Sequence, residues 1–226
     1  MSETSLHAAL KDWYTQAGDR QEVNIDGYYI DVVTEQALIE IQTRHFGAMK
    51  AKLAALLDRH AMCVVHPIAA EKWLAYLPEN PGLPVTRRKS PRKGRFEEIF
   101  HELVRFPELL AHPNFSLEVL LVREEEVRRA DGRGSWRRGG VSIVDRRLIE
   151  IVDRRIIRQP GDLRQFLPAG LSQPFTNADL ARSLRIPQRL AGRMTFCLRS
   201  LQVLQPGGKR GRSLLFEIQS SRGETP

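Results

Sequence analysis

The stretch Asp31-Val-Val-Thr-Glu-Gln-Ala-Leu-Ile-Glu40-Ile-Gln42 decides how the N-terminal part of this sequence is expected to fold. It is typical of the end of one apolar strand, a tight turn at residues 34–36 and a second short strand. Side chains two residues apart on a strand point to the same side, so Glu40 and Gln42 share a face. The turn brings Asp31 beside them. Two carboxylates that converge from neighbouring strands favour a hard divalent cation such as Mg²⁺.

The residues around this stretch follow the order helix, three strands, helix, strand. Helical spacing of apolar residues, a turn at Asp26-Gly27 and short apolar runs define these elements. We expect helices over 5–17 and 46–59, and strands over 23–33, 38–43, 62–68 and 72–77. This order predicts an α/β fold in which helices flank a mixed sheet.

The middle of the chain continues this pattern with further strands and basic turns. We expect a flexible loop over 78–95, a helix over 96–104, a strand over 117–127, a basic turn over 132–140 and a pair of strands over 141–157. Pro160-Gly161 marks a domain boundary, because proline and glycine together interrupt regular structure.

The C-terminal residues have a different layout. Leu163, Phe166 and Leu167 begin a first predicted helix. Thr176-Asn177 caps a predicted helix over 178–184, and a short turn follows. A third helix is expected over 188–203, the segment Gln205-Pro-Gly-Gly208 ends it, and residues 213–218 close as a strand. Helix, turn, helix and then a basic, glycine-rich hairpin predict a small winged helix-turn-helix domain.

Composition narrows the classes of partner. The 226 residues carry 35 basic and 27 acidic side chains, a formal charge of +8, so polyanions and above all nucleic acid are the expected partners. A merely basic surface is the alternative. The apolar runs are shorter than the roughly 18 residues that span a bilayer, and no secretory signal is visible. Cys63 and Cys197 lie in apolar runs, so we expect reduced thiols, a cytoplasmic location and no membrane contact.

Residues 1–130 resemble the PD-(D/E)XK nuclease superfamily. The resemblance rests on Asp31, on Glu40-Ile41-Gln42 in the following strand and on the amphipathic helix after it. It implies a restriction-endonuclease-like sheet and a hydrolase that depends on Mg²⁺ or Mn²⁺, in which the aspartate and the glutamate bind the metal. The third residue of the family motif is usually lysine. Gln42 stands in its place here, as glutamine does in some restriction endonucleases.

The chemistry of phosphodiester hydrolysis assigns a role to each residue of this set. A cation held by Asp31 and Glu40 lowers the pKa of a bound water and neutralises charge on the phosphate oxygens. Gln42 orients the attacking water through hydrogen bonds but supplies no positive charge. A lysine of the next helix, Lys50 in preference to Lys52, is expected to supply that charge. Glu22, which begins the preceding strand, is a candidate third metal ligand.

These residues also have structural interpretations. A structural ion pair or a decayed site is the alternative for Asp31 and Glu40. Asp26 is assigned to its turn, because Asp-Gly is a turn pair in its own right. His45 and His66 are interpreted either as outer groups of the site or as structural histidines.

The predicted third helix and the basic clusters, which we expect in exposed loops, supply the candidates for DNA binding. Residues opposite the apolar stripe of the helix would meet base edges, and basic loop residues would meet phosphates. The candidates are Gln188, Arg189, Arg193, Arg199, Lys209, Arg210, Arg212, Arg88, Lys89, Arg92 and Lys93. Thr195 and Phe196 are expected on the same open face, where Phe196 favours the alternative of protein contact. Trp136, among arginines, either stacks on an unpaired base or pins its own loop.

The sequence therefore predicts a two-part DNA-binding protein. Residues 1–130 form a nuclease-like domain, 131–160 a strand-rich connection with a basic loop, 161–219 the winged helix and 220–226 a disordered tail. The predicted activity is Mg²⁺- or Mn²⁺-dependent endonuclease cleavage of DNA, duplex DNA first, and a homodimer is a further expectation. One rival is a non-catalytic DNA-binding regulator built on a degenerate nuclease-like scaffold, which Gln42 supports. The other is an RNA-processing or RNA-binding protein.

Overall fold

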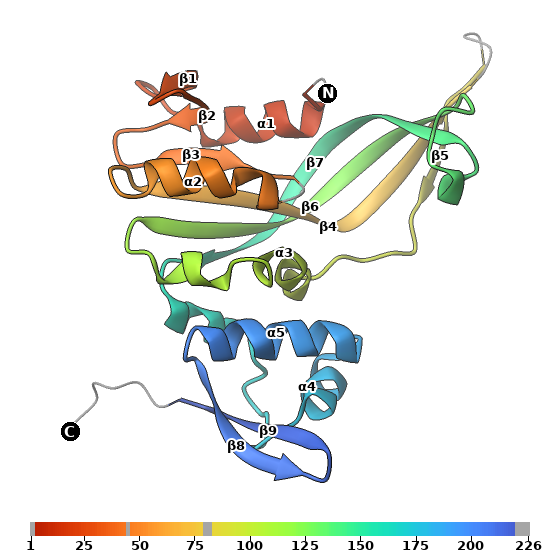
Figure 1. Ribbon diagram of the computed structural model, residues 1–226. Coiled ribbons are helices and arrows are strands. Elements are labelled where there is room, and N and C mark those ends of the chain that lie inside the picture. The colour runs from red at the N-terminus through yellow and green to blue at the C-terminus, as the bar shows by residue number, and fades with distance from the viewer. Residues whose placement is uncertain (1–2, 44–45, 79–82, 220–226) are drawn as a thin grey trace. The chain divides into compact units, whose positions relative to one another are not determined.

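The computed structural model describes residues 3–43, 46–78 and 83–219 (Figure 1). The α-helices are α1 Ser5–Tyr14, α2 Lys50–Leu56, α3 Phe100–Leu103, α4 Asn177–Leu184 and α5 Gln188–Ser200. Short 3₁₀ helices are η1 Phe46–Met49, η2 Phe96–Ile99, η3 Pro107–Ala111, η4 Trp136–Arg138 and η5 Pro160–Phe166. The strands are β1 Arg20–Ile25, β2 Tyr28–Val33, β3 Leu38–Ile41, β4 Met62–Leu77, β5 Thr86–Lys89, β6 Phe115–Ala130, β7 Val141–Ile157, β8 Leu204–Arg210 and β9 Ser213–Ile218.

The strands form one large sheet and one hairpin. The large sheet has seven strands in the order β1-β2-β3-β4-β6-β7, with β5 paired to β4, and β8 pairs with β9 separately. Helices precede, interrupt and follow these strands, which confirms the predicted α/β class and its mixed sheet. The predicted turn Asp26-Gly27 joins β1 to β2, and both of its residues take positive φ angles, 50° and 87°.

The described residues fall into two compact units. The first is drawn from the ranges Met1–Arg44, Cys63–Phe96 and Glu118–Arg155, and it holds α1 and most of the large sheet. The second is drawn from His45–Met62, Glu97–Leu117 and Ile156–Pro226, and it holds α2, α3, α4, α5 and the β8–β9 hairpin. The predicted disordered tail 220–226 lies outside the described residues.

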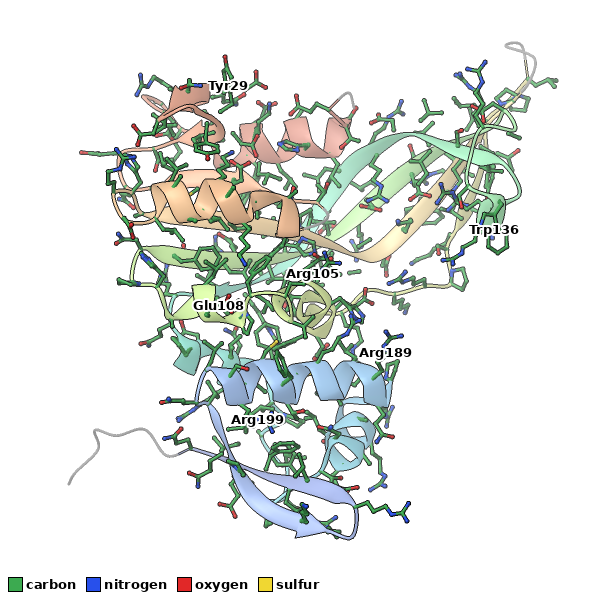
Figure 2. All side chains as sticks on the ribbon, viewed as in Figure 1. Tyr29, Arg105, Glu108, Trp136, Arg189 and Arg199 are labelled. Atoms are coloured by element: carbon green, nitrogen blue, oxygen red, sulfur yellow. The ribbon has the colours of Figure 1, made fainter. Side chains whose placement is uncertain are left out.

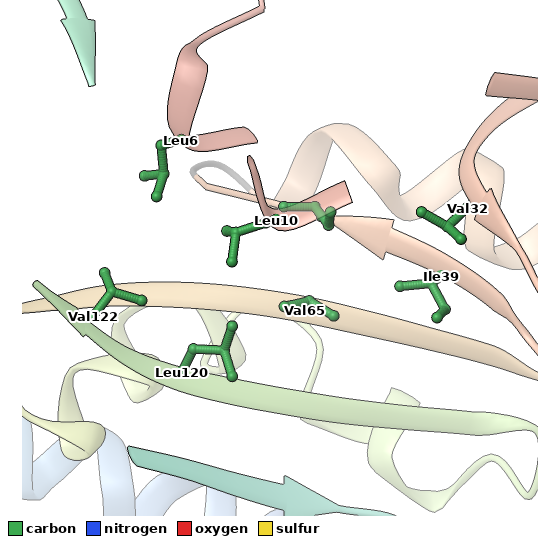
Figure 3. Packing of buried hydrophobic residues seen from close by; sticks show 8 residues of the cluster. Leu6, Leu10, Val32, Ile39, Val65, Leu120 and Val122 are labelled. Atoms are coloured by element: carbon green, nitrogen blue, oxygen red, sulfur yellow. The ribbon is translucent and has the colours of Figure 1, made fainter. Parts of the chain in front are cut away.

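The core of the first unit joins α1 to the sheet. Leu6 and Leu10 are one helical turn apart, so both point to the same side of α1, and both are buried. They pack with apolar side chains of four strands (Figure 3): Val32, Ile39, Ile41, Val65, Leu120 and Val122. Asp145 of β7 caps the start of α1 by accepting hydrogen bonds from the Ser5 backbone N–H at 2.9 Å and hydroxyl at 2.7 Å. These contacts fix α1, and with it the side chains on its other faces.

Two strands are longer than the sequence predicts. β4 is one strand over 62–77, where two strands were expected, because the intervening Ala-Ala-Glu segment contains no turn-forming residue. β7 is a single strand of 17 residues, where a strand pair was expected. Alternation of apolar and charged residues over 141–157 is compatible with either, and the absence of glycine and proline from that segment favours the single strand.

The basic run at residues 87–89 forms a strand, although a loop was predicted. β5 pairs antiparallel with β4, with Trp73 opposite Lys89 and Tyr76 opposite Thr86. The Arg87 guanidinium lies 4.3 Å from the centroid of the Trp73 ring. The apolar stems and the delocalised charge of basic side chains pack on aromatic rings, which offsets the cost of ordering them. A basic run can therefore form an edge strand when aromatic residues face it.

The second unit contains a capped helix pair followed by the hairpin. Thr176 caps α4 through a capping box with Asp179, as the sequence predicts. Arg185, in the left-handed conformation at φ 53°, ends α4, and α5 follows over Gln188–Ser200. β8 runs through the segment 205–208 that was expected only to break a helix, with a register shift between Pro206 and Lys209. Within the described residues, none of the helices has the length and apolar character needed to cross a membrane.

Candidate functional site

Asp31 lies where the pairing between β2 and β3 ends. The paired residues of these strands are Val32 with Ile39 and Val33 with Leu38, and the next residue in this register is Asp31 opposite Glu40. The Asp31 carboxylate accepts a hydrogen bond from the Ile41 backbone N–H at 2.7 Å through Oδ2. Its side chain therefore takes the place of a backbone partner and lies against the Glu40–Gln42 segment.

Glu40 and Gln42 alternate along β3 with residues of the α1 core. Ile39 and Ile41 belong to that core, so Glu40 and Gln42 stand on the other side of the strand. Both are half-buried. The Gln42 backbone is held on both sides, because its N–H donates to the Val65 carbonyl at 2.8 Å and its carbonyl lies 2.6 Å from Nδ1 of His66. His66 thus positions the strand end next to the candidate site, while His45 lies outside the described residues.

Helix α1 supplies a partner that the sequence analysis missed. His7 Nε2 lies 3.1 Å from Asp31 Oδ1, and the two side chains are 24% and 18% exposed. The hydrogen bond to Asp31 raises the pKa of His7, although its partial burial acts in the opposite direction. The spacing of Glu3, His7 and Lys11 at i, i+4 and i+8 places them on one face of α1, and this was the signal that could have revealed the partner.

Glu22, the predicted third ligand, forms an ion pair in the structure, and its role as a metal ligand stays a prediction. Its carboxylate lies 2.5 Å from the Nζ of Lys11, and its side chain is 65% exposed. Among the residues that the structure describes, no three or more histidine, cysteine, aspartate or glutamate side chains are grouped so that they could hold a metal ion. Lys11 is itself buried and also pairs with Glu3 at 2.7 Å, so an ion pair occupies the position where a ligand was expected.

The two other residues considered for this region, Lys50 and Asp26, lie in different elements of the structure. Lys50 opens α2, is exposed and belongs to the second compact unit, so its role at Gln42 stays a prediction. Asp26 occupies the left-handed region in the β1–β2 turn, where Asn24 accepts a hydrogen bond from the Gly27 N–H at 3.1 Å. The turn alone accounts for the Asp26-Gly27 pair.

A second group of carboxylates lies deeper in the same unit and was not predicted. Glu124 and Glu126 of β6 are 3% and 2% exposed. Lys72 Nζ lies 2.8 Å from Glu124 Oε1 and 3.0 Å from Glu126 Oε2, and Arg128 Nη2 lies 2.6 Å from Glu126 Oε1. The pKa of Glu126 is lowered because these cations outweigh the opposing effect of its burial. This group is a compensated network of permanent charges.

The predicted DNA-contacting residues of α5 separate into exposed and engaged side chains. Gln188, Arg189 and Arg199 are exposed. Arg193 is half-buried, and its guanidinium hydrogen-bonds His101 of α3 within the second unit. Thr195, expected on the open face, is instead buried, and its hydroxyl donates to Asn177 Oδ1 at 2.6 Å. Thr195 is buried because its short polar side chain hydrogen-bonds a residue of α4. The apolar stripe of the helix alone does not predict this contact.

The basic residues of the β8–β9 hairpin also differ in whether they contact other parts of the second unit. Lys209 and Arg212 are exposed beside the turn. Arg210 reaches back to the start of α4, where its Nη1 lies 3.0 Å from Asp179 Oδ2. Arg210 therefore also fastens the hairpin to the helix pair.

The remaining predicted DNA-binding residues lie on or beside β5. Lys89 pairs with Glu71 at 2.7 Å, and Arg88 donates a long hydrogen bond of 3.4 Å to the Tyr76 hydroxyl. Arg92 and Lys93 follow the strand and are exposed. This basic edge thus presents side chains that are partly balanced by Glu71 of β4.

Comparisons with known proteins place the candidate site inside a recognised family region. Residues 4–158 match the family described as "Domain of unknown function (DUF8091)". An uncharacterized protein of Treponema pallidum (strain Nichols) is 35% identical over 221 residues, which cover 95% of this chain and 84% of the relative. No solved structure matches the chain. The family match includes Asp31, Glu40 and Gln42 and ends before η5 begins at Pro160.

Proposed function

The chain belongs to the family described as "Domain of unknown function (DUF8091)", and we propose that it is a metal-dependent DNA endonuclease. Its substrate is the DNA phosphodiester bond, and its cofactor is Mg²⁺ or Mn²⁺. The reacting groups are those of the β2–β3 junction, and the C-terminal helices and hairpin carry the protein to DNA.

One observation carries this proposal: the hydrogen bond from the Ile41 N–H to the Asp31 carboxylate. It holds an acid at the point where two strands stop pairing, in register with a second acid, Glu40. A half-buried carboxylate is costly to keep ionised unless a cation or donor compensates it. One side-chain partner of Asp31 is His7, whose charge depends on pH. A divalent cation can therefore replace the charge of His7 at Asp31.

We propose that Asp31 and Glu40, which are opposite each other in the register of β2 and β3, together hold Mg²⁺ or Mn²⁺. Mg²⁺ keeps several of its waters and takes one or two protein carboxylates, so a third acid is not required. When bound, the cation would supply an acidified water and charge stabilisation at the phosphate. Gln42 would hold the attacking water through its amide, and its strand end is fixed through Val65 and His66.

The second unit supports the proposal that a winged helix targets the protein to DNA. α4 and α5 form a helix-turn-helix, and β8–β9 follows α5 directly. Phe175, just before α4, pairs through its backbone with Phe216 of β9, so a third extended segment joins the hairpin. The exposed Arg189 and Arg199 of α5 would meet base edges or phosphates, and Lys209 and Arg212 would meet phosphates from the hairpin.

A plasmid-nicking assay tests the proposal. Supercoiled plasmid is incubated with the protein and Mg²⁺ or Mn²⁺, and nicked circles are quantified. We expect wild type to nick, and Asp31→Asn and Glu40→Gln to lose nicking while they keep their affinity for duplex DNA. The control Glu150→Gln changes a 51% exposed acid in the same unit and should nick normally. Nicking by Asp31→Asn at the wild-type rate would contradict the assignment.

A non-catalytic DNA-binding regulator is the second candidate. Gln42 stands where the resembling nucleases usually have lysine, and Asp31 already has a cationic partner when His7 is protonated. In that function the β2–β3 junction is a scaffold. Wild type that binds duplex DNA but nicks with neither metal would favour the regulator.

A further inference from the structure

Trp136 is the most exposed large apolar side chain of the described residues. It is 83% exposed and lies in η4, in the loop that joins β6 to β7 (Figure 2). Exposing a tryptophan to this extent forgoes the large gain from burying its ring. The ring of Trp136 is therefore accessible to a partner on both its apolar face and its indole N–H.

The loop that carries Trp136 is held together without its ring. Gly134 N–H donates to the Gly140 carbonyl at 2.8 Å, and Ser135 accepts from the Arg138 N–H at 2.8 Å and from the Gly140 N–H at 3.3 Å. Asp131 accepts from the Ser142 hydroxyl at 2.7 Å and from the Arg133 N–H at 3.0 Å.

Glycine makes this tight closure possible. A Cβ at Gly134 would lie only 1.9 Å from the Val141 carbonyl oxygen. Backbone bonds and glycines therefore fix the loop, and the interpretation that Trp136 pins it loses its basis. The indole is instead presented outward on a defined scaffold.

The surroundings of Trp136 are strongly basic. Residues 128–142 contain five arginines and one aspartate. That aspartate, Asp131, is already bonded within the loop, and the Arg137 guanidinium lies 5.5 Å from the centroid of the Trp136 ring. Arg133, Arg137 and Arg138 are exposed. An aromatic ring among arginines is suited to a nucleobase face with its adjoining phosphates.

We infer that the β6–β7 loop is a binding site for single-stranded DNA, in which Trp136 stacks on an unpaired base and the neighbouring arginines contact the flanking phosphates. This inference deepens the proposed function and rests on it for the choice of DNA. Duplex DNA presents stacked bases whose faces are covered, so an exposed indole gains little from it. The substrate class is therefore DNA with an unpaired stretch, such as a gap, flap or fork.

Binding of a fluorescein-labelled oligothymidylate and of a labelled blunt duplex tests the inference, in EDTA and at one salt concentration. Trp136→Ala should weaken binding of the oligothymidylate about tenfold, since base stacking on an aromatic ring is worth roughly 1–3 kcal/mol per base. Trp136→Phe should keep most of the affinity. The matched control Tyr29→Ala, which removes a 72% exposed aromatic ring elsewhere in the same unit, should change nothing. Duplex affinity should be unchanged in all three variants.

Three results would overturn the inference. The first is wild-type affinity of Trp136→Ala for the oligothymidylate, and the second is an equal loss for duplex. The third is oligouridylate outcompeting oligothymidylate, which would assign the loop to RNA. Because binding is measured without metal, it is independent of nicking. Asp31→Asn should bind the oligothymidylate as wild type does, so a failure of the nuclease proposal would leave this result standing.

Discussion

Two groups of carboxylates in the first compact unit are held in opposite ways. Glu124 and Glu126 are almost fully buried and are paired with the cationic side chains of Lys72 and Arg128. Asp31 is 18% exposed, and one of its side-chain partners is His7, which is charged only when protonated. The first group is neutralised by the fold itself. The neutralisation of the second group by His7 depends on pH.

The difference indicates which acids are available for chemistry. A buried carboxylate that is closed off by fixed cations gains little from another cation, and removing one of its partners leaves uncompensated charge. A carboxylate held by a backbone N–H and a histidine can exchange its partner. We therefore expect substitutions in the first group to lower stability, and substitutions in the second to alter activity and pH dependence.

The largest expected effect is on stability, at Lys72. Lys72→Met keeps the apolar stem but removes the ammonium that lies within 3.0 Å of both Glu124 and Glu126. We expect the free energy of unfolding to fall by about 3–5 kcal/mol, measured by urea denaturation, because breaking a buried pair leaves a buried charge.

Lys89→Met is the matched control. Lys89 pairs with Glu71 at 2.7 Å, but its side chain is 43% exposed. Its loss should cost about 1 kcal/mol or less. Equal losses in the free energy of unfolding would contradict the distinction between the buried group of charges around Lys72 and the exposed ion pair of Lys89.

A smaller effect is expected at Gln42, on activity. Gln42→Lys restores the residue usual in the resembling nucleases and would add a positive charge at the proposed position of the scissile phosphate. The rate of plasmid nicking should rise about tenfold, which corresponds to about 1.4 kcal/mol of barrier. A rate that is unchanged or lower, in a variant that unfolds at the wild-type urea concentration, would speak for a regulator in place of a nuclease.

The smallest effect is expected at His7, and it depends on pH. The pKa of His7 is raised above 6.5 by Asp31, so its pairing stabilises the fold fully below pH 6.5 and is lost as pH rises through the raised pKa. Deprotonation also releases Asp31 for a cation. His7→Gln should therefore cost about 1 kcal/mol or less at low pH and nothing at high pH.

The same substitution should flatten the pH dependence of Mn²⁺ affinity, which in wild type should increase with pH. Unfolding curves at several pH values, together with Mn²⁺ titrations, measure both effects. A wild-type Mn²⁺ affinity that falls as pH rises would reverse the role given to His7.

Local rules were sufficient for much of the fold. Asp26-Gly27 predicted the β1–β2 turn, Thr176 predicted the start of α4, and apolar spacing predicted α1 and α5. These features depend on neighbouring residues, and so the sequence shows them directly. The continuous β4 and β7 and the strand β5 depend on pairing between distant segments. The Trp73 ring that holds Arg87, for example, gives no signal near residue 87.

The candidate site could be predicted only in part for the same reason. The alternation Glu40-Ile41-Gln42 places two side chains on one face whatever the tertiary structure. The partners of the acids in this region come from a different element: His7 of α1 contacts Asp31, and Lys11 of α1 forms an ion pair with Glu22. Glu124 and Glu126, in a run of three glutamates, have the sequence of a solvated surface, and only the sheet buries them.

Calorimetric titration with Mn²⁺ tests the central claim most directly, since that claim is that Asp31 and Glu40 hold a divalent cation. Wild type should release or absorb heat with saturation at one ion per chain, and Asp31→Asn and Glu40→Gln should each abolish that heat. Glu150→Gln should titrate as wild type does. No heat from wild type, or the same heat from Asp31→Asn, would contradict the account and leave only the DNA-binding surfaces to explain the protein.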